Sequence, residues 1–287
     1  MKKLLIALGL LFFGQGFAQD LAPTLLWKIT NGKDDSKPSY LYGTVHATCE
    51  VELGGTVQEA LQKTRQLYLE IKMDDPALQA KMMQGAMMKD GKTTSKLMSK
   101  DDAKLLSDFL QKEAGFALAM VDGLKPMLLS SMLLPKMLDC PMQSVEERLM
   151  SITKSQSEAI FGLESIEDQL SVFDAIPYEV QANEILKMAK DGMKESREDM
   201  KTLVSLYREQ NIEGLYDFTL NAGDQMMATY QDVLLNNRNQ KWVPLIMKIS
   251  SETPTFFAVG AAHLAGDQGV INLLRKEGLK VEPVMMY

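Results

Sequence analysis

The stretch Thr255-Phe-Phe-Ala-Val-Gly-Ala-Ala-His263 decides the fold, because an apolar, β-forming run meets a glycine, two small residues and then a histidine. The same design occurs far upstream in Tyr40-Leu-Tyr-Gly-Thr-Val-His46. The chain has only two histidines, and both lie in the frame strand–Gly-x-x-His. We therefore expect two neighbouring strands of one sheet that present both imidazoles at the same end. Gly43 and Gly260 would let the backbone bend there, or let a ligand approach, without a Cβ in the way.

Two interpretations of this pair of histidines stay open from the residues alone. Imidazole is the commonest metal ligand and the usual acid–base group near neutral pH, so His46 and His263 would suit a shared site. Alternatively, both are satisfied histidines near the edge of a sheet. The shared site is excluded if the two rings lie at opposite ends of the sheet, or if either ring is sealed in apolar packing.

The first 19 residues form a predicted signal peptide. A positive n-region, Lys2-Lys3, precedes a short apolar run from Leu4 to Phe13 and then small residues that suit cleavage. No cysteine directly follows the apolar run to accept a lipid, and no later run reaches the roughly 18 apolar residues that a membrane span needs. We expect residues 20–287 to form one soluble domain that is periplasmic or secreted.

The composition narrows the class of partner. A net charge of −7 and an isoelectric point near 5.1 argue against a nucleic-acid partner, which would require a basic face. The 21 methionines invite a metal or haem interpretation. However, Met82, Met83, Met87 and Met88 fall at helical spacings, and methionine commonly fills irregular gaps in a core. We expect these methionines to be core residues.

The two cysteines, Cys49 and Cys140, would enter an oxidising compartment. They either form a disulfide there or remain two unrelated buried thiols. Because Cys49 lies three residues after His46, a bond would pin the loop of the first histidine to the helical part of the chain. Closing a loop of about 90 residues would stabilise the fold by roughly 4 kcal/mol on the chain-entropy model. Cα atoms more than about 7 Å apart would exclude the bond.

The order of predicted elements indicates an α/β fold with a mixed central β-sheet and a large helical insertion. Period-two patterns and apolar runs mark the strands, and helical patterns fill 75–138 and most of 177–250. The predicted strands, in chain order, are 25–30, 39–45, 66–73, 159–163, 255–259 and 279–286.

Two carboxylates are candidates for the same sheet edge as the histidines. Glu70 lies in the middle of its predicted strand, and Glu164 directly follows a short strand. Two imidazoles with one or two carboxylates suit Mn²⁺, Co²⁺ or Zn²⁺, and an open position on such an ion activates water. The plainer alternatives are a solvent-facing strand residue for Glu70 and a carboxylate at a helix N-terminus for Glu164.

Arg238 lies between two asparagines in an amphipathic run. Such an arginine either holds a carboxylate or an oxyanion, or is an ordinary surface residue. The chain has no Gly-x-Ser-x-Gly elbow, P-loop, dinucleotide fingerprint or Cys-x-x-Cys motif. Since both histidines already belong to the strand frames, a separate Ser-His-Asp site is not expected.

Several stretches together resemble the TraB/GumN family, whose animal relatives are the Tiki proteins. They are LYGTVH at 41–46, YLEI at 68–71, FGLESIEDQ at 161–169, and LLNNRNQKW at 234–242 leading into FFAVGAAHLAGDQGVINLLRKEGLKV at 256–281. These stretches occur in the family's order and span almost all of the mature chain. The family pattern falls on Gly43 with His46, Glu70, Arg238 with Asn239, and Gly260 with His263.

The resemblance implies an erythromycin-esterase/ChaN-like fold and, for Tiki-like members, a Mn²⁺- or Co²⁺-dependent peptidase. In this chain it implies that His46, His263 and Glu70 bind the metal, and that Glu70, Glu164 and Arg238 act in catalysis. The expected function is hydrolysis of a peptide or protein outside the cytoplasm. The alternative is a non-catalytic protein that sequesters a peptide, or by fold analogy haem, in the same pocket.

Overall fold

The sheet is mixed, and its strand order is β4-β3-β5-β2-β1-β6. The computed structural model describes residues 21–31, 36–221 and 225–285, so the predicted signal peptide lies outside the described residues. β1 is antiparallel to both of its neighbours, and the other pairs are parallel. The predicted α/β class with a mixed central sheet is confirmed. The strands are β1 (Leu26–Thr30), β2 (Ser39–Thr44), β3 (Gln66–Leu69), β4 (Ala159–Gly162), β5 (Phe256–Gly260) and β6 (Lys280–Val284).

The strands of the two Gly-x-x-His frames, β2 and β5, lie side by side. They are parallel, with Tyr40 opposite Phe256 and Thr44 opposite Gly260. The prediction that these two strands neighbour one another is therefore confirmed. Because parallel strands run in the same direction, the chain leaves both of them at the same edge of the sheet.

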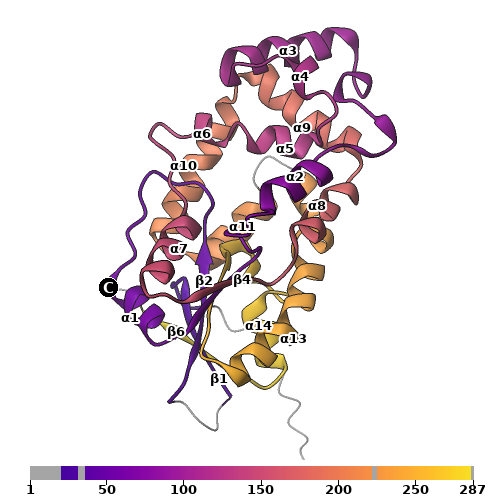
Figure 1. The fold of residues 1–287 in the computed structure, drawn as a ribbon. Helices are drawn as coiled ribbons and strands as arrows, with labels where there is room; N and C mark the ends of the chain where they lie inside the picture. Colours follow the sequence, from indigo (N-terminus) through magenta and orange to yellow (C-terminus); the bar gives the residue numbers. More distant parts are fainter. Residues whose placement is uncertain (1–20, 32–35, 222–224, 286–287) are drawn as a thin grey trace, which may run out of the picture.

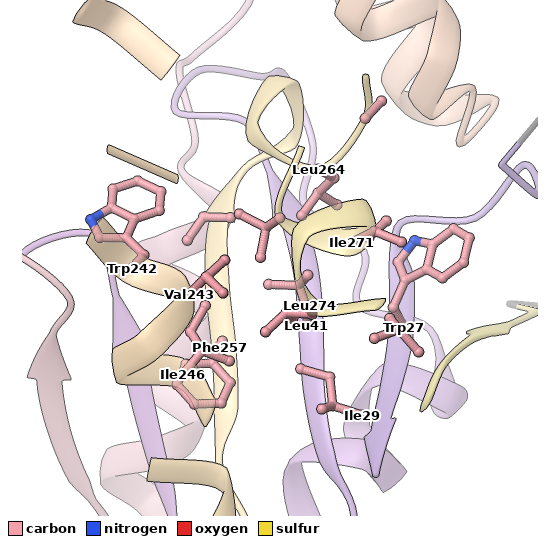
Figure 2. Close-up of a cluster of buried hydrophobic side chains, with 14 of the residues drawn as sticks. Trp27, Ile29, Leu41, Trp242, Val243, Ile246, Phe257, Leu264, Ile271 and Leu274 are labelled. Atoms are coloured by element: carbon pink, nitrogen blue, oxygen red, sulfur yellow. The ribbon is translucent and has the colours of Figure 1, made fainter. Parts of the chain in front are cut away.

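The sheet is buried on both faces by helices α1 (Gly55–Gln62), α7 (Val145–Ser155), α13 (Asn237–Glu252) and α14 (Val270–Lys276). Successive residues of a strand point to opposite faces. Leu41 and Phe257 face α13 and α14, and Figure 2 shows this apolar layer. Tyr42 and Phe256 face the opposite layer, which includes residues of α1 and α7. Burial on both faces fixes the register of β2 and β5, and so it fixes where the two histidine loops begin.

The predicted helical insertion is confirmed, and its helices stand above the sheet in Figure 1. They pack around their own apolar cluster, which includes Leu106, Leu129 and Ile185. No helix among the described residues is long and apolar enough to cross a membrane. The remaining helical segments are α2 (Leu78–Gly85), η1 (Lys89–Gly91), η2 (Thr94–Lys96), α3 (Lys100–Ala114), α4 (Leu118–Val121), α5 (Pro126–Ser131), α6 (Leu134–Met137), α8 (Ile166–Asp174), α9 (Tyr178–Asp191), α10 (Lys194–Arg208), α11 (Ile212–Asn221), α12 (Gln225–Thr229), η3 (Asp232–Asn236) and η4 (Ala261–His263).

Two local predictions are wrong. Met82, Met83 and Met87 are exposed, and of that group only Met88 is buried. Met82 and Met83 lie on α2, whereas Met87 and Met88 follow the end of this helix at Gly85. The strand β3 ends at Leu69, so Glu70 lies just beyond the strand rather than in its middle. Glu70 is nevertheless buried, because polar partners surround it at the sheet edge.

Candidate functional site

Four of the predicted residues line one cavity of about 460 Å³ at the end of β2 and β5. His46 comes from the loop after β2, Glu70 from the end of β3, Arg238 from α13 and His263 from η4. The two imidazoles therefore lie at the same end of the sheet, as the repeated sequence frame predicts. The polar floor of the cavity is built where four separate segments of the chain meet.

The two frame glycines allow close approach of neighbouring groups. A Cβ on Gly260 would lie 3.3 Å from Glu70 Oε1, and the Gly260 N–H donates to that oxygen at 2.8 Å. A Cβ on Gly43 would lie 2.9 Å from a methyl of Leu264 and 3.1 Å from Cβ of Ala261. Neither Gly43 nor Gly260 has the left-handed backbone conformation that favours glycine. Glycine is therefore needed at these positions because a side chain would crowd neighbouring atoms.

Arg238 joins the two predicted carboxylates. Its Nη2 donates to Glu70 Oε2 and to Glu164 Oε1, both at 2.6 Å. The carboxylates are neighbours because β3 and β4 are parallel, and the Glu164 N–H donates to the Glu70 carbonyl oxygen at 2.9 Å. The guanidinium also lies 4.7 Å from the ring centre of Trp242. With its side chain only 11 % exposed, Arg238 is not a surface residue, and Glu70 does not face solvent.

The segment before Arg238 is a π-helical turn, η3, which leads directly into α13. Leu234 and Leu235 of this turn are buried and line the cavity. The Arg238 Nη1 donates to the Leu234 carbonyl oxygen at 3.1 Å. Single π-turns in helices are frequent at functional sites, because the widened turn redirects the side chains after it. Nothing in the sequence pattern indicated this turn.

His263 is held as a neutral imidazole. Asn239 donates through Nδ2 to the carbonyl oxygens of His263 and Gln268, so its Oδ1 is left to accept the Nδ1–H of His263 at 2.6 Å. The Nε2 lone pair then accepts from Arg238 Nη1 at 3.1 Å. Burial lowers the pKa of His263 to about 3, and the nearby Arg238 cation adds to this effect. The ring is 5 % exposed, but its partners are polar and it lines the cavity, so it is not sealed in apolar packing.

His46, in contrast, is held as a protonated imidazolium cation. Its Nδ1 lies 2.8 Å from Oε1 of Glu146, a buried carboxylate at the start of α7. This hydrogen bond raises the pKa of His46 to about 9, against the effect of burial. The side chain is nevertheless 67 % exposed, because it stands in an open cavity that protein surrounds. Its Nε2 has no hydrogen-bond partner among the described residues and is left to the cavity.

Glu146 is the residue that the sequence prediction missed. Its Oε1 accepts from the Thr44 hydroxyl and its Oε2 from the Ser144 hydroxyl, both at 2.7 Å. Burial alone would raise the pKa of Glu146, but its bonds with His46, Thr44 and Ser144 outweigh burial and hold the pKa below its usual range. Ser144 does cap α7, as its hydroxyl accepts from the Glu147 N–H at 3.3 Å. A capping pattern, however, gives no sign of which acidic residue turns inward.

The predicted Cys49–Cys140 disulfide is present, with Cα atoms 5.5 Å apart. Beside it, Thr48 and Gln143 exchange two backbone hydrogen bonds of 3.0 and 2.8 Å. The bond and the bridge together tie the loop of His46 to the segment that leads into α7. The disulfide is thus the one sequence signal that places the start of α7 near His46.

The two carboxylates on Arg238 differ in proton affinity. Burial raises the pKa of Glu164, and the neighbouring charge of Glu70 adds to this. Burial also opposes ionisation of Glu70, but Arg238, the two imidazoles and the Gly260 N–H together outweigh it and lower the pKa of Glu70 to about 2. Because one guanidinium serves two buried carboxylates, the ionised pair is Arg238 with Glu70, and Glu164 is the more easily protonated partner.

The predicted metal ligands do not form a metal centre as they are arranged. Among the described residues, no three His, Cys, Asp or Glu side chains are placed to hold one ion. His263 Nε2 and Glu70 Oε1 lie 3.8 Å apart, but Arg238 already donates to both residues. The guanidinium therefore occupies the Nε2 lone pair of His263 and one of the two carboxylate oxygens of Glu70, Oε2. The residue types of the predicted ligands suit Mn²⁺ or Co²⁺, but their arrangement in this structure does not.

Comparison with known proteins gives one match. A model of the TraB/PrgY/gumN family matches residues 25–283. No curated protein sequence and no solved structure matches the chain. The matched range includes the site residues His46, Glu70, Glu164, Arg238 and His263. The chain therefore belongs to the TraB/PrgY/gumN family.

Proposed function

We propose that this protein is a hydrolase that cleaves an amide bond in a peptide or protein outside the cytoplasm. The observation that carries the proposal is that two imidazoles in opposite protonation states line one cavity. Pairs of titratable groups whose surroundings push their pKa values apart are typical of acid–base catalysis. The Cys49–Cys140 bond suits an oxidising compartment and supports the periplasmic or secreted location. We further propose that the sheet and insertion form an erythromycin-esterase/ChaN-like fold.

In the proposed reaction, the substrate carbonyl oxygen accepts a hydrogen bond from Arg238, whose charge stabilises the developing oxyanion. This contact draws Arg238 Nη1 away from His263, so that the Nε2 lone pair of His263 takes a proton from water as the water oxygen bonds to the carbonyl carbon. The protonated His46 gives its Nε2 proton to the leaving amine nitrogen as the carbon–nitrogen bond breaks. Glu70 keeps Arg238 charged, and Glu146 keeps His46 protonated.

The metal expected from the family resemblance stays a prediction. Mn²⁺, Co²⁺ or Zn²⁺ bound by His46, Glu70 and His263 would require Arg238 to leave the position that it holds between Glu70 and His263. The proposed proton transfers therefore use only the chain's own residues. Chelation decides between the two routes, because only a metal-dependent reaction is lost with chelator and restored by adding the ion.

The direct test is a cleavage assay with a library of quenched fluorescent peptides, with and without chelator. We expect cleavage by the mature chain and a loss of at least about 100-fold in His46→Ala and His263→Ala. Lys104→Ala is the matched control, because Lys104 pairs with Asp108 on the exposed face of α3 and does not line the cavity. Cleavage that survives both histidine substitutions, or no cleavage of any peptide, would contradict the proposal.

A second candidate is binding without catalysis. It is favoured by the free Nε2 of His46, which faces a cavity with mostly apolar walls. Once it has lost its proton, this nitrogen would serve as an axial ligand for haem. Haem added to the protein would then give a visible absorption band that His46→Ala removes. A band in the absence of any peptide cleavage would favour this candidate over the hydrolase.

A further inference from the structure

A second cleft adjoins the site cavity. It has a volume of about 440 Å³ and lies among α5, α6, α9 and α10 of the helical insertion. The cleft and the site cavity share four lining residues, Met127, Phe173, Leu203 and Met227. A molecule held at the polar floor would therefore extend directly into this cleft.

The walls of the cleft are apolar and adaptable. Met188, Met200 and Phe218 line it in addition to the shared residues, and these side chains are only partly buried. Methionine is unbranched and polarisable, so methionine-rich surfaces repack around apolar side chains of different shapes. The cleft is thus suited to large apolar side chains rather than to one rigid ligand.

Two acidic residues of α10, Glu195 and Asp199, line the same cleft. They are four positions apart on one helix, where like charges repel and destabilise the helix. Burial, together with the charge of Glu195, raises the pKa of Asp199. The nearby Arg197 is directed elsewhere, toward Glu113 and the Lys136 carbonyl oxygen. Lys187 also lines the cleft but pairs with Glu184. Among the described residues, no cation forms an ion pair with Glu195 or Asp199.

We propose that this cleft binds the non-reacting side of the peptide substrate, as a segment with large apolar side chains next to a basic residue. The apolar side chains contact the methionines, and the basic residue is placed between Glu195 and Asp199. This assignment rests on the proposed function and adds its substrate class. The charge complementarity of the acidic pair selects a cationic peptide over a neutral or acidic one.

The test uses direct binding, so that it does not depend on cleavage. Short fluorescein-labelled peptides carry Leu-Leu-Lys, Leu-Leu-Glu or Ser-Ser-Lys in the same glycine–serine frame, and anisotropy with the full mature chain gives Kd. We expect the Leu-Leu-Lys peptide to bind at least about tenfold more tightly than either of the other two. Equal binding of all three peptides would overturn the inference.

The variant Glu195→Gln/Asp199→Asn removes the acidic pair with almost no change of shape. We expect it to bind the Lys and Glu peptides equally, whereas Glu198→Gln keeps the tenfold preference. Glu198 is the matched control because it lies on α10, pairs with Lys201 and does not line the cleft. The double variant should also unfold at the same or a higher temperature, since it loses a repulsion. A preference for Lys that survives in the double variant would refute the assignment.

Two further outcomes separate this inference from the proposed function. Selective binding of the Leu-Leu-Lys peptide without cleavage of any peptide would refute the hydrolase and leave the cleft assignment standing. Cleavage of library peptides with no preference for apolar or basic residues would refute the cleft assignment alone. Dodecyltrimethylammonium serves as a second probe. If it displaces the Leu-Leu-Lys peptide and binds more tightly, the occupant is a cationic amphiphile, and the peptide assignment is wrong.

Discussion

The two histidines occupy equivalent positions after neighbouring parallel strands, yet their surroundings are opposite. His46 stands in the open cavity with its ring 67 % exposed and takes its charge from the Glu146 carboxylate. His263 is 5 % exposed and lies between Asn239 and Arg238, and its burial together with the Arg238 charge leaves it neutral. The same local sequence frame thus positions one cation and one neutral base.

The difference arises from the segment that packs against each strand end. The end of β2 faces the start of α7, which the disulfide and the Thr48–Gln143 bridge hold in place. The end of β5 faces α13, whose π-turn delivers Arg238 and Asn239 to the ring. A strand end therefore fixes where an imidazole lies, while a helix from elsewhere in the chain fixes its charge.

The largest effect is expected from removing the cation on the His263 side. Arg238→Met leaves Glu70 and Glu164 buried without a counter-charge, and we expect it to lower the free energy of unfolding by up to about 5 kcal/mol. Denaturant unfolding measures this loss. Arg197→Met is the control, because the Arg197 side chain is more exposed and its ion pair with Glu113 is long, at 3.7 Å. A loss below about 1 kcal/mol for Arg238→Met would show that the two carboxylates do not depend on one shared guanidinium.

The corresponding change on the His46 side is removal of the disulfide. Cys49 and Cys140 are separated by 91 positions, so Cys49→Ser/Cys140→Ser should cost about 4 kcal/mol on the chain-entropy model. We also expect activity to fall, because Glu146 loses the tether that holds it near His46. Thermal unfolding and peptide cleavage would be measured on the same preparation. Unchanged activity in the double variant would mean that the backbone bridge alone positions α7.

Replacing each histidine with alanine compares the two surroundings directly. His263→Ala leaves a cavity and an unpaired Asn239 Oδ1, so we expect a loss of about 2 to 3 kcal/mol. His46→Ala removes an exposed ring, and Glu146 keeps the hydroxyls of Thr44 and Ser144, so this loss should be the smaller of the two. Both variants should lose activity. Equal losses of stability in denaturant unfolding would contradict the difference in burial.

The pH dependence of stability should separate the two rings with opposite sign. The pKa of His46 in the folded state is raised to about 9, so its contribution is complete below about pH 6.5 and is lost as the pH rises through 9. The pKa of His263 is lowered to about 3, so the unfolded chain takes up the proton first and stability falls as the pH drops from about 6.5 toward 3. His46→Ala should flatten the alkaline side of the profile and His263→Ala the acid side. The same slope change in both variants would refute the assignment of opposite charge states.

The sequence predicts the sheet edge better than it predicts the charge states there. The repeated frame fixes the pairing of β2 with β5 and the common end of the two imidazoles, because register and direction follow from buried apolar runs. Glu164 follows for the same reason, as the residue directly after a strand, whereas Glu70 was predicted in the middle of its strand and lies just beyond the end of β3. Arg238 gained a role only from the family resemblance, since the amphipathic run does not reveal the π-turn that directs it.

The features that the sequence could not predict depend on contacts between distant helices. Glu146 shares its helix turn with Glu147, and only the tertiary position of α7 decides which one reaches His46. The second cleft, among α5, α6, α9 and α10, is formed by the apolar faces of these helices. A periodic sequence pattern would assign such faces to the core. Met82 and Met83 show the converse case, because a helical spacing marked them as core and both side chains are exposed.

The measurement that tests the central claim most directly is an NMR titration of the two imidazoles. The chain has only two histidines, so two ring signals are expected, and His46→Ala assigns them. We predict that the His46 signal titrates near pH 9, and that the His263 signal stays that of a neutral ring with its proton on Nδ1 until the pH approaches about 3. In Glu146→Gln the His46 midpoint should fall toward its ordinary value of 6.5. Two signals that both titrate near pH 6.5 in the unaltered protein would contradict the claim that these strand ends hold one cation and one neutral base.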